Sequence, residues 1–440
     1  MSPESSPQSA PHDRRLTVCF VSHSGDHGGA QLSMLELIDG LTARGVDCRV
    51  VLPEDGVVAA ALQRRRVPHL MYRFRRWATG APRSRWDRVL KKPLVHVWRG
   101  AKLARLIRGW DCDVVVTNTI TVCEGALAAA LLGLPHVTHA REYGDLDHGL
   151  HFEFGPRLSV RILHGLSARF VFNSAALARY YAREVPARYS TVIYNAVSDV
   201  GQPRSPGAAA TGSGVDEEAF ECVLVGSLAP GKGHEEAIRA IEVLRRRGLV
   251  VRLKIVGAFG PAGYERSLWE LSEVLGIRGQ VEMTGHVVEP WSFFRRADVA
   301  LMCSRMEAFG RVTVEAMKVG TPVIGARSGG TPEIVRDGVN GLLYSPGDAE
   351  DLADKIELLA RDRASVRAMG ERARLFATEV FNLERHVGEF LQVLRDVTRT
   401  PVHHGKIWLV LGWMASVASR ISRRAAQGSG GHRSSSTKAP

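Results

Sequence analysis

Short apolar runs alternate with amphipathic stretches along most of the chain. The runs predict buried strands at 16–22, 48–53, 113–118, 222–226, 253–256 and 299–303. Between them, apolar residues recur three or four positions apart, as from Ala30 to Arg44, and this spacing predicts helices. Strands that alternate with helices form parallel α/β sheets with helices on both faces. At 440 residues the chain is long for one such sheet, so we expect two domains of about 200 residues each.

Low-complexity stretches divide the chain. Residues 1–14 are rich in Ser and Pro and predict a disordered tail, without the apolar segment of a secretory signal. Residues 201–217 are rich in Gly, Ala and Ser. They predict a linker between an N-terminal domain at 15–200 and a C-terminal domain at 218–380. A terminal helix is expected at 381–400.

The tail at 401–440 contains an apolar segment at 407–418 with basic residues on both sides. This segment is too short to span a bilayer, which takes about 20 residues. Two alternatives remain. It forms a helix that lies in the membrane interface, with Trp408 and Trp413 at headgroup depth, or a helix that packs on the protein body.

Positive charge is concentrated in one stretch of the chain. The net charge is +12, and residues 64–108 alone carry fifteen Lys or Arg residues against one acid, Asp87, which gives +14. Trp77, Trp86 and Trp98 are interleaved with these charges. The pattern fits a solvated charged face over core aromatics, or an anionic membrane surface. No nucleic-acid-binding motif accompanies it, so we do not expect a nucleic-acid partner.

The six cysteines form no C-x-x-C pair and lie mostly in apolar runs. We therefore predict that they are reduced core residues of a cytoplasmic protein, which the basic stretch would bring to the inner face of the membrane.

The turn after the apolar run at 299–303 has the features of an anion site. It leads into a predicted helix, and the first backbone N–H groups of a helix bind phosphate. Those groups would belong to Phe309, Gly310, Arg311 and Val312. Glu307 and Glu315 flank these groups. The alternative interpretation of each glutamate is a solvated residue at the helix end, where the helix dipole favours negative charge. Glu315 suits the vicinal diol of a ribose, and Glu307 suits hydroxyl groups of a sugar.

The spacing of these two glutamates resembles the E-x7-E signature of the retaining glycosyltransferases of family 4. Further blocks carry the resemblance: VGSLAPGKG at 225–233, LKIVG at 253–257, VEMTGHV at 281–287 and SGGTPEIVRDGVNGLLYSPGD at 328–348. The N-terminal half matches more weakly, through GGAQLSMLELIDGL at 28–41. The resemblance implies α/β GT-B architecture, with two facing Rossmann-like domains and the helix at 381–400 crossing back to the first.

The resemblance also implies a reaction. A sugar would move from a nucleotide-sugar donor, bound by the C-terminal domain, to an acceptor bound by the N-terminal domain, with retention of anomeric configuration. The expected acceptor is a glycan or a lipid-linked molecule of the cell envelope, and no cofactor or metal ion is expected. Two alternatives stay open: a non-catalytic adaptor that binds nucleotide sugars, and a GT-B sugar-nucleotide epimerase.

The family pattern implies site residues one by one. Lys232 takes the place of a lysine that contacts the donor diphosphate, while Ser227 stands where relatives carry an arginine. Glu307 and Glu315 take the places of the two signature glutamates. The donor would further contact the loop glycines and strand-end residues Gly28, Gly29, Gly257 and Val287.

A departure from the family occurs after the predicted strand that begins at His136. Relatives carry a His-Asp pair there, and this chain has Arg141 and Glu142 instead, with His139 two residues earlier. We expect Arg141 to act with Glu307 and Lys232 as a catalytic group, because a guanidinium group binds phosphate well. His139 is the alternative, and a buried role fits it equally well.

Overall fold

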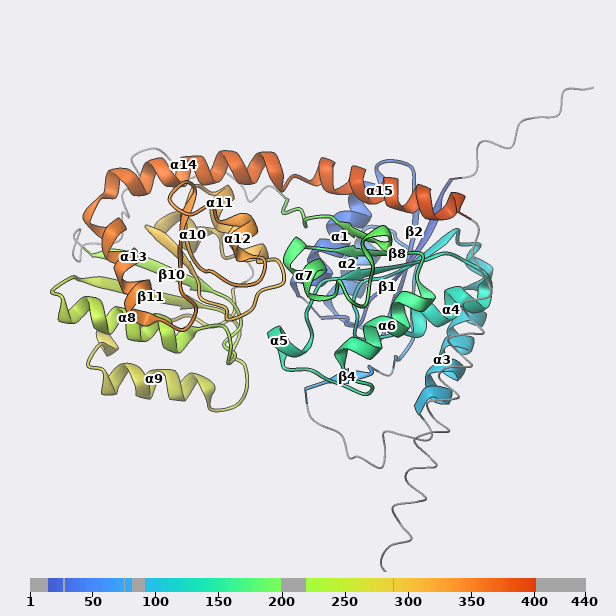
Figure 1. The fold of residues 1–440 in the computed structure, drawn as a ribbon, viewed down its shortest axis with the longest axis horizontal. Coiled ribbons are helices and arrows are strands. Elements are labelled where there is room, and N and C mark those ends of the chain that lie inside the picture. The colour runs from blue at the N-terminus through green and yellow to red at the C-terminus, as the bar shows by residue number, and fades with distance from the viewer. Residues whose placement is uncertain are drawn as a thin grey trace, which may run out of the picture.

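The computed structural model describes residues 15–26, 28–74, 76–80, 92–198, 219–287 and 289–400. The predicted tails at 1–14 and 401–440, the predicted linker at 201–217, and Trp86 lie outside these residues. Two lobes lie side by side, and α14 and α15 run along one side of both (Figure 1).

The N-terminal lobe is built on a parallel seven-stranded sheet of order β3-β2-β1-β5-β6-β8-β9. Its strands are β1 (Thr17–Val21), β2 (Asp47–Leu52), β3 (His69–Met71), β5 (Val114–Thr117), β6 (His136–Ala140), β8 (Arg169–Phe172) and β9 (Ser190–Val192). Its helices are α1 (Gly29–Thr42), α2 (Val57–Arg64), α3 (Lys92–Ile107), α4 (Glu124–Leu132), α5 (Asp145–His148), α6 (Pro156–Leu166) and α7 (Ala175–Tyr180). A small antiparallel ribbon joins β4 (Ala78–Thr79) to β7 (His151–Phe152).

The C-terminal lobe is built on a parallel six-stranded sheet of order β12-β11-β10-β13-β14-β15. Its strands are β10 (Phe220–Val225), β11 (Val251–Val256), β12 (Val281–Met283), β13 (Val299–Met302), β14 (Val323–Ala326) and β15 (Gly341–Tyr344). Its helices are α8 (His234–Arg246), α9 (Tyr264–Val274), α10 (Trp291–Arg296), α11 (Arg311–Lys318), α12 (Thr331–Ile334), α13 (Ala349–Arg361) and α14 (Arg363–Val380).

The last helix, α15 (Leu383–Arg399), returns to the N-terminal lobe. Its apolar face, which includes Val387, Phe390 and Leu394, is part of the core beneath the first sheet. Gly40 of α1 allows this contact, because a Cβ atom at that position would collide with the side chain of Val387. The expected α/β fold with a crossing helix is therefore confirmed, and with it the prediction that six buried cysteines are free thiols.

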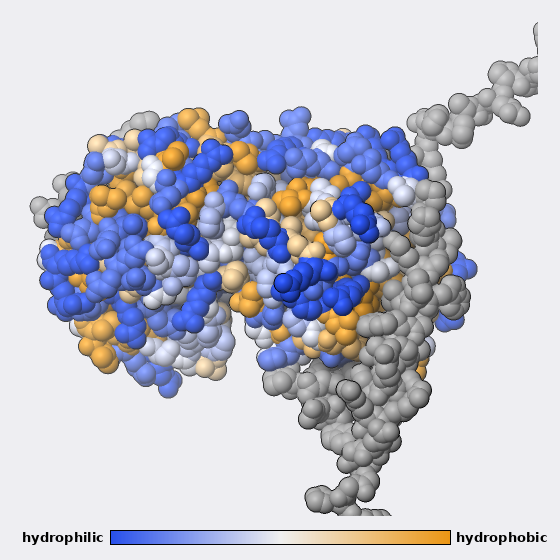
Figure 2. Space-filling model, viewed as in Figure 1, coloured by the Kyte–Doolittle hydropathy of each residue, from blue (hydrophilic) through white to orange (hydrophobic). Residues whose placement is uncertain are grey.

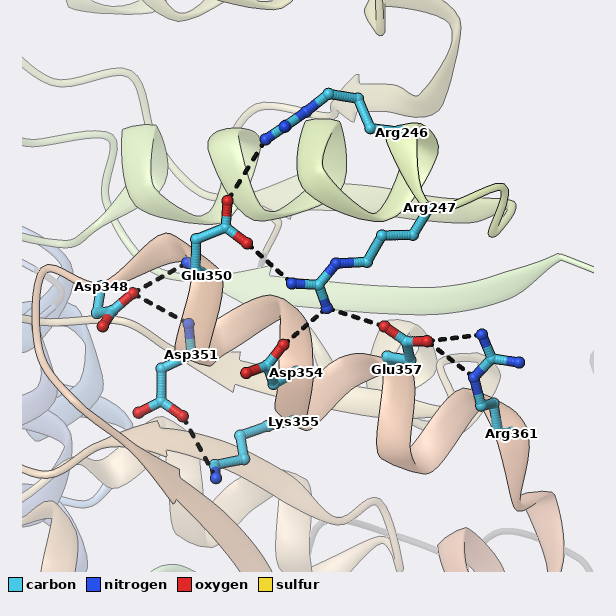
Figure 3. Close-up of polar contacts among 9 residues, drawn as sticks. All are labelled: Arg246, Arg247, Asp348, Glu350, Asp351, Asp354, Lys355, Glu357 and Arg361. Atoms are coloured by element: carbon cyan, nitrogen blue, oxygen red, sulfur yellow. Dashed lines mark hydrogen bonds and ion pairs between the residues drawn. The ribbon is translucent and has the colours of Figure 1, made fainter.

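Helix α13 is fixed to α8 by an ion-pair network around Arg247 (Figure 3). The guanidinium group of Arg247 donates hydrogen bonds to Glu350 at 2.8 Å, Asp354 at 2.7 Å and Glu357 at 2.9 Å. Asp348 caps the helix by accepting hydrogen bonds from the backbone N–H groups of residues 350 and 351. Exposed pairs contribute little energy one by one, so this network mainly fixes how the two helices align.

The tryptophans of the basic stretch at 64–108 lie in different environments. Trp77 is a core residue, 1% exposed, and its indole N–H donates to the carbonyl of Ile120 at 2.8 Å, so it cannot face a membrane. Trp98 on α3 is 61% exposed, and the ammonium group of Lys102 lies 5.7 Å from its ring centroid. Among the described residues, no helix is both long and apolar enough to cross a bilayer.

Candidate active site

Two loops of the C-terminal lobe meet at the carboxyl ends of β10 and β13. The backbone N–H of Arg305 donates to the carbonyl of Gly231 at 2.9 Å, which joins the loops. Gly233 has a φ of 77°, and a Cβ atom there would collide with Cys303, so only glycine allows this approach. As a result the ammonium group of Lys232 lies 3.0 Å from the carboxylate of Glu307, although 75 residues separate them in sequence.

The ion pair between Lys232 and Glu307 is partly shielded from water. The side chains are 27% and 20% exposed. Burial alone raises the pKa of Glu307, but the charge of Lys232 and its hydrogen bond outweigh this effect and hold the pKa below its usual value. The charge of Glu307 raises the pKa of Lys232 in turn. Both groups are therefore ionised at neutral pH.

A third loop, at residues 328–330, contacts the backbone of Glu307. The N–H of Gly330 donates to the carbonyl of Glu307 at 2.7 Å. Gly310, whose φ is 92°, then precedes α11, so the first N–H groups of this helix belong to Arg311 and Val312. Phe309 itself is 3% exposed and its ring packs against Tyr194 and Phe381, so its side chain is a core group.

Arg311 bridges the two lobes. Its guanidinium group forms two hydrogen bonds with Glu36 of α1, at 2.5 and 2.8 Å, and a third with Glu315 at 2.8 Å. Both carboxylates are held by this one cation. Burial raises the pKa of Glu315 in spite of Arg311, whereas Arg311 lowers the pKa of Glu36 against the effect of burial. Arg311 is therefore paired with two carboxylates. A diphosphate would bind Arg311 only by replacing one of these carboxylates.

Arg141 lies in a different environment, with neutral partners. Its guanidinium group bonds to Asn118 at 2.5 Å, to Asn195 at 2.8 Å and to the ring of His139 at 3.3 Å. Arg141 is 6% exposed, and burial lowers its pKa to about 9, so it keeps its charge at neutral pH. Within the described part of the chain, no carboxylate forms an ion pair with it.

His139 is fully enclosed in the N-terminal lobe. Its ring is fully buried and lies 5.1 Å from the ring of Phe390 of α15, measured between centroids. Burial lowers its pKa well below the usual value, so it is neutral. Of the two alternatives for the family histidine, Arg141 is the one whose chemistry suits a charged ligand.

Each half of the chain matches a family model of known proteins. The model described as "Glycosyltransferase Family 4" matches residues 27–199, and the model described as "Glycosyl transferases group 1" matches residues 210–376. The Anabaena protein HepE, solved in complex with UDP, superimposes with a TM-score of 0.72 at 23% identity, over 87% of this chain and 100% of that one. The fold is the GT-B fold, and each half of the chain matches a glycosyltransferase family model.

Two curated relatives give the extent of the similarity. The D-inositol 3-phosphate glycosyltransferase of Arthrobacter sp. is 26% identical over 427 residues, which is 87% of this chain and 94% of the relative. The protein of the same name from Saccharomonospora viridis is 36% identical over 205 residues, 44% of this chain and 47% of the relative. The chain thus matches about half the length of that second relative.

The remaining residues that the sequence predicts at a donor site lie at loop and strand ends. Gly28 is the N-cap of α1, and Gly29 is open enough to accept a Cβ atom without contact. Ser227 is exposed and Val287 is half-buried. Gly257 has a structural reason to be glycine, because a Cβ atom would collide with the carbonyl of Gly226.

Sequence reasoning missed three charged residues of the N-terminal lobe. Asp147 and His148 of α5 act on the Lys232–Glu307 pair: the charge of His148 lowers the pKa of Glu307, and that of Asp147 raises the pKa of Lys232. The third is Glu36, which pairs with Arg311. No local pattern singles out these residues, because their significance comes only from what lies opposite them.

A basic hollow of about 720 Å³ lies on the N-terminal lobe, beside the residues that follow β2. Arg73, Arg76 and Arg99 contribute three guanidinium groups to it, and Glu54 the one carboxylate. Arg99 donates to the carbonyl of Arg73 at 2.9 Å, while its Nε atom is buried without a partner. Among the described residues, none of the three arginines forms an ion pair with a carboxylate, so the hollow suits an anionic group.

The space-filling view shows a notch between the lobes, on the side away from α14 and α15 (Figure 2).

Proposed function

We propose that this protein transfers a sugar, with retention of configuration, from a nucleotide-sugar donor to an acceptor that carries a phosphate group. The observation that carries the proposal is the ion pair of Lys232 with Glu307 at the strand-end cleft. A cation and a carboxylate side by side suit the junction between the diphosphate and the sugar of the donor. The UDP complex of HepE supports a donor of this class.

The C-terminal domain, at 218–380, binds the donor. Negative charge develops on the leaving diphosphate as the glycosidic bond breaks, and Lys232 and the N-terminus of α11 stabilise it. Glu307 orients hydroxyl groups of the sugar, and Glu315 accepts hydrogen bonds from the ribose. Arg141 contributes a third positive charge from the opposite domain. We assign no part of this step to a metal ion, and retention rests on the family resemblance.

The N-terminal domain, at 15–200, binds the acceptor. The hollow lined by Arg73, Arg76 and Arg99 supports a phosphate or diphosphate on that molecule. A relative that is named for D-inositol 3-phosphate agrees with an anionic acceptor. A lipid-linked acceptor of the cell envelope fits as well, because α3 exposes Leu94, Trp98 and Lys102 at intervals of four residues, on one side of the helix. Such a protein would work at the inner face of the membrane.

The test begins with the donor. A thermal-shift screen of UDP-, GDP- and ADP-sugars identifies the nucleotide, because a ligand that binds the native state raises its stability. Transfer is then measured with the labelled donor and phosphate-bearing acceptors, and NMR of the product gives its anomeric configuration. We expect a product with the anomer of the donor. Binding of a nucleotide sugar without transfer to any acceptor would contradict the proposal and favour an adaptor.

A further inference from the structure

A buried group of side chains with metal-binding chemistry lies between α3 and α4. It consists of His96 on α3, and of Cys123 and Glu124 at the start of α4. One ligand atom of each residue lies within 4.8 Å of the others. All three residues are at most 1% exposed. None of them belongs to the proposed donor or acceptor site.

The three side chains offer the atoms that zinc prefers. Zinc in proteins is bound by cysteine sulfur, histidine nitrogen and carboxylate oxygen, and a set of three such ligands leaves a fourth position for water. The Nδ1 atom of His96 lies 3.1 Å from Oε1 of Glu124, within hydrogen-bond distance, and a zinc ion between them would take the place of the shared proton. The second oxygen of Glu124 accepts the backbone N–H of Cys123 at 3.2 Å, which orients the carboxylate.

A second carboxylate supports the histidine from its other side. Oε2 of Glu153 lies 3.2 Å from Nε2 of His96. A histidine that binds a metal through one nitrogen almost always donates its other N–H to such an acceptor, which fixes the ring orientation and the tautomer. The backbone N–H of Glu153 in turn donates to the carbonyl of Trp77 at 2.7 Å, and the ring of Trp77 lies edge-on to that of His96.

We propose that His96 Nδ1, Cys123 Sγ and Glu124 bind one zinc ion, with Glu153 as the outer hydrogen-bond partner of the histidine. The ion joins α3 to the start of α4 and, through Glu153, to the segment after β7. The ion would hold the basic helix α3 against α4, with its fourth position left to a water molecule. It does not depend on the proposed transfer reaction.

The test is the zinc content of the full chain after purification with zinc and gel filtration, measured by mass spectrometry. We expect one zinc ion per chain, and its loss in Cys123→Ala. Cys48→Ala is the matched control, since Cys48 is also a buried free thiol but lies on β2. Glu153→Gln should keep the ion with an affinity lower by about 10- to 100-fold, measured by chelator competition, as for loss of an outer partner.

A second measurement uses only the native sequence, in case Cys123→Ala fails to fold. Replacement of zinc by cobalt should give a thiolate-to-cobalt charge-transfer band, which is absent if the ion lies elsewhere. A native chain that carries no zinc after loading with excess metal would overturn the proposal. So would a folded Cys123→Ala variant with its full zinc content, or a cobalt-bound native chain without the band.

Discussion

Removal of the Lys232 ammonium group separates its role in stability from its role in turnover. In Lys232→Ala the side chain of Glu307, which is 20% exposed in the native structure, loses its cation. Loss of one partner costs about 3–5 kcal/mol for a fully buried pair and about 0–1 kcal/mol for a surface pair. The pair is intermediate in exposure, so we expect a loss of about 1–3 kcal/mol in the free energy of unfolding.

The pH dependence of this loss has a defined sign. In the native chain the pKa of Glu307 lies below its usual value, so the pair stabilises the fold above the unfolded pKa and loses this effect as pH falls through the folded pKa. In the variant the two contributions of Lys232, which lower the pKa of Glu307 most, are gone and burial remains, so the pKa of Glu307 rises. The carboxylate is then protonated as the pH falls, so the difference between native and variant should be larger at about pH 7 than at about pH 5.

Turnover should fall by about 10²–10³-fold in Lys232→Ala, as for loss of one donor to a developing oxyanion. Stability is measured by denaturant titration and turnover with a labelled nucleotide sugar. The control is Lys254→Ala, because Lys254 forms an exposed pair with Glu282 at the same distance of 3.0 Å. That variant should lose at most about 1 kcal/mol and keep its activity.

A double variant, Lys232→Met with Glu307→Gln, distinguishes the two roles. It removes both charges, so stability should recover in part while turnover stays low. The reasoning is refuted if Lys232→Ala turns over at the native rate. It is also refuted if the double variant is as active as the native chain.

Three further predictions concern the nucleotide, the acceptor and the membrane. Glu315→Gln should weaken the binding of the nucleoside diphosphate by about 1–3 kcal/mol in calorimetry, the range for a hydrogen bond to a charged group, and an unchanged affinity in a folded variant rejects the ribose assignment. Arg99→Gln should raise KM for a phosphate-bearing acceptor and leave nucleotide affinity unchanged, so a KM equal to the native value excludes the basic hollow as the acceptor site. The full chain should sediment with anionic vesicles less as salt rises, because the Debye length shrinks. Trp98→Ala and deletion of 401–440 should each weaken this binding, and a native chain that stays in the supernatant at low salt contradicts membrane association.

Local sequence predicted several of the strands and helices, including those next to Lys232 and Glu307. The apolar run at 299–303 predicted β13 (Val299–Met302), and the helical spacing from Ala30 to Arg44 predicted α1 (Gly29–Thr42). Periodicity reports which face of an element is buried, and parallel strands present their carboxyl ends at one edge. Lys232 follows β10 and Glu307 follows β13, so both could be expected at the same edge of the sheet.

Tertiary structure decided what each of these groups faces. Arg311 pairs with Glu36, which is 275 residues away in sequence, and no local pattern indicates that the cation is already held by carboxylates. Trp77 looked the same as Trp98 within the basic stretch, yet one lies in the core and the other on the surface. Sequence periodicity specifies burial, whereas the partner of a buried charge is set by the packing of distant elements, because Coulomb and hydrogen-bond energies depend on distance in space.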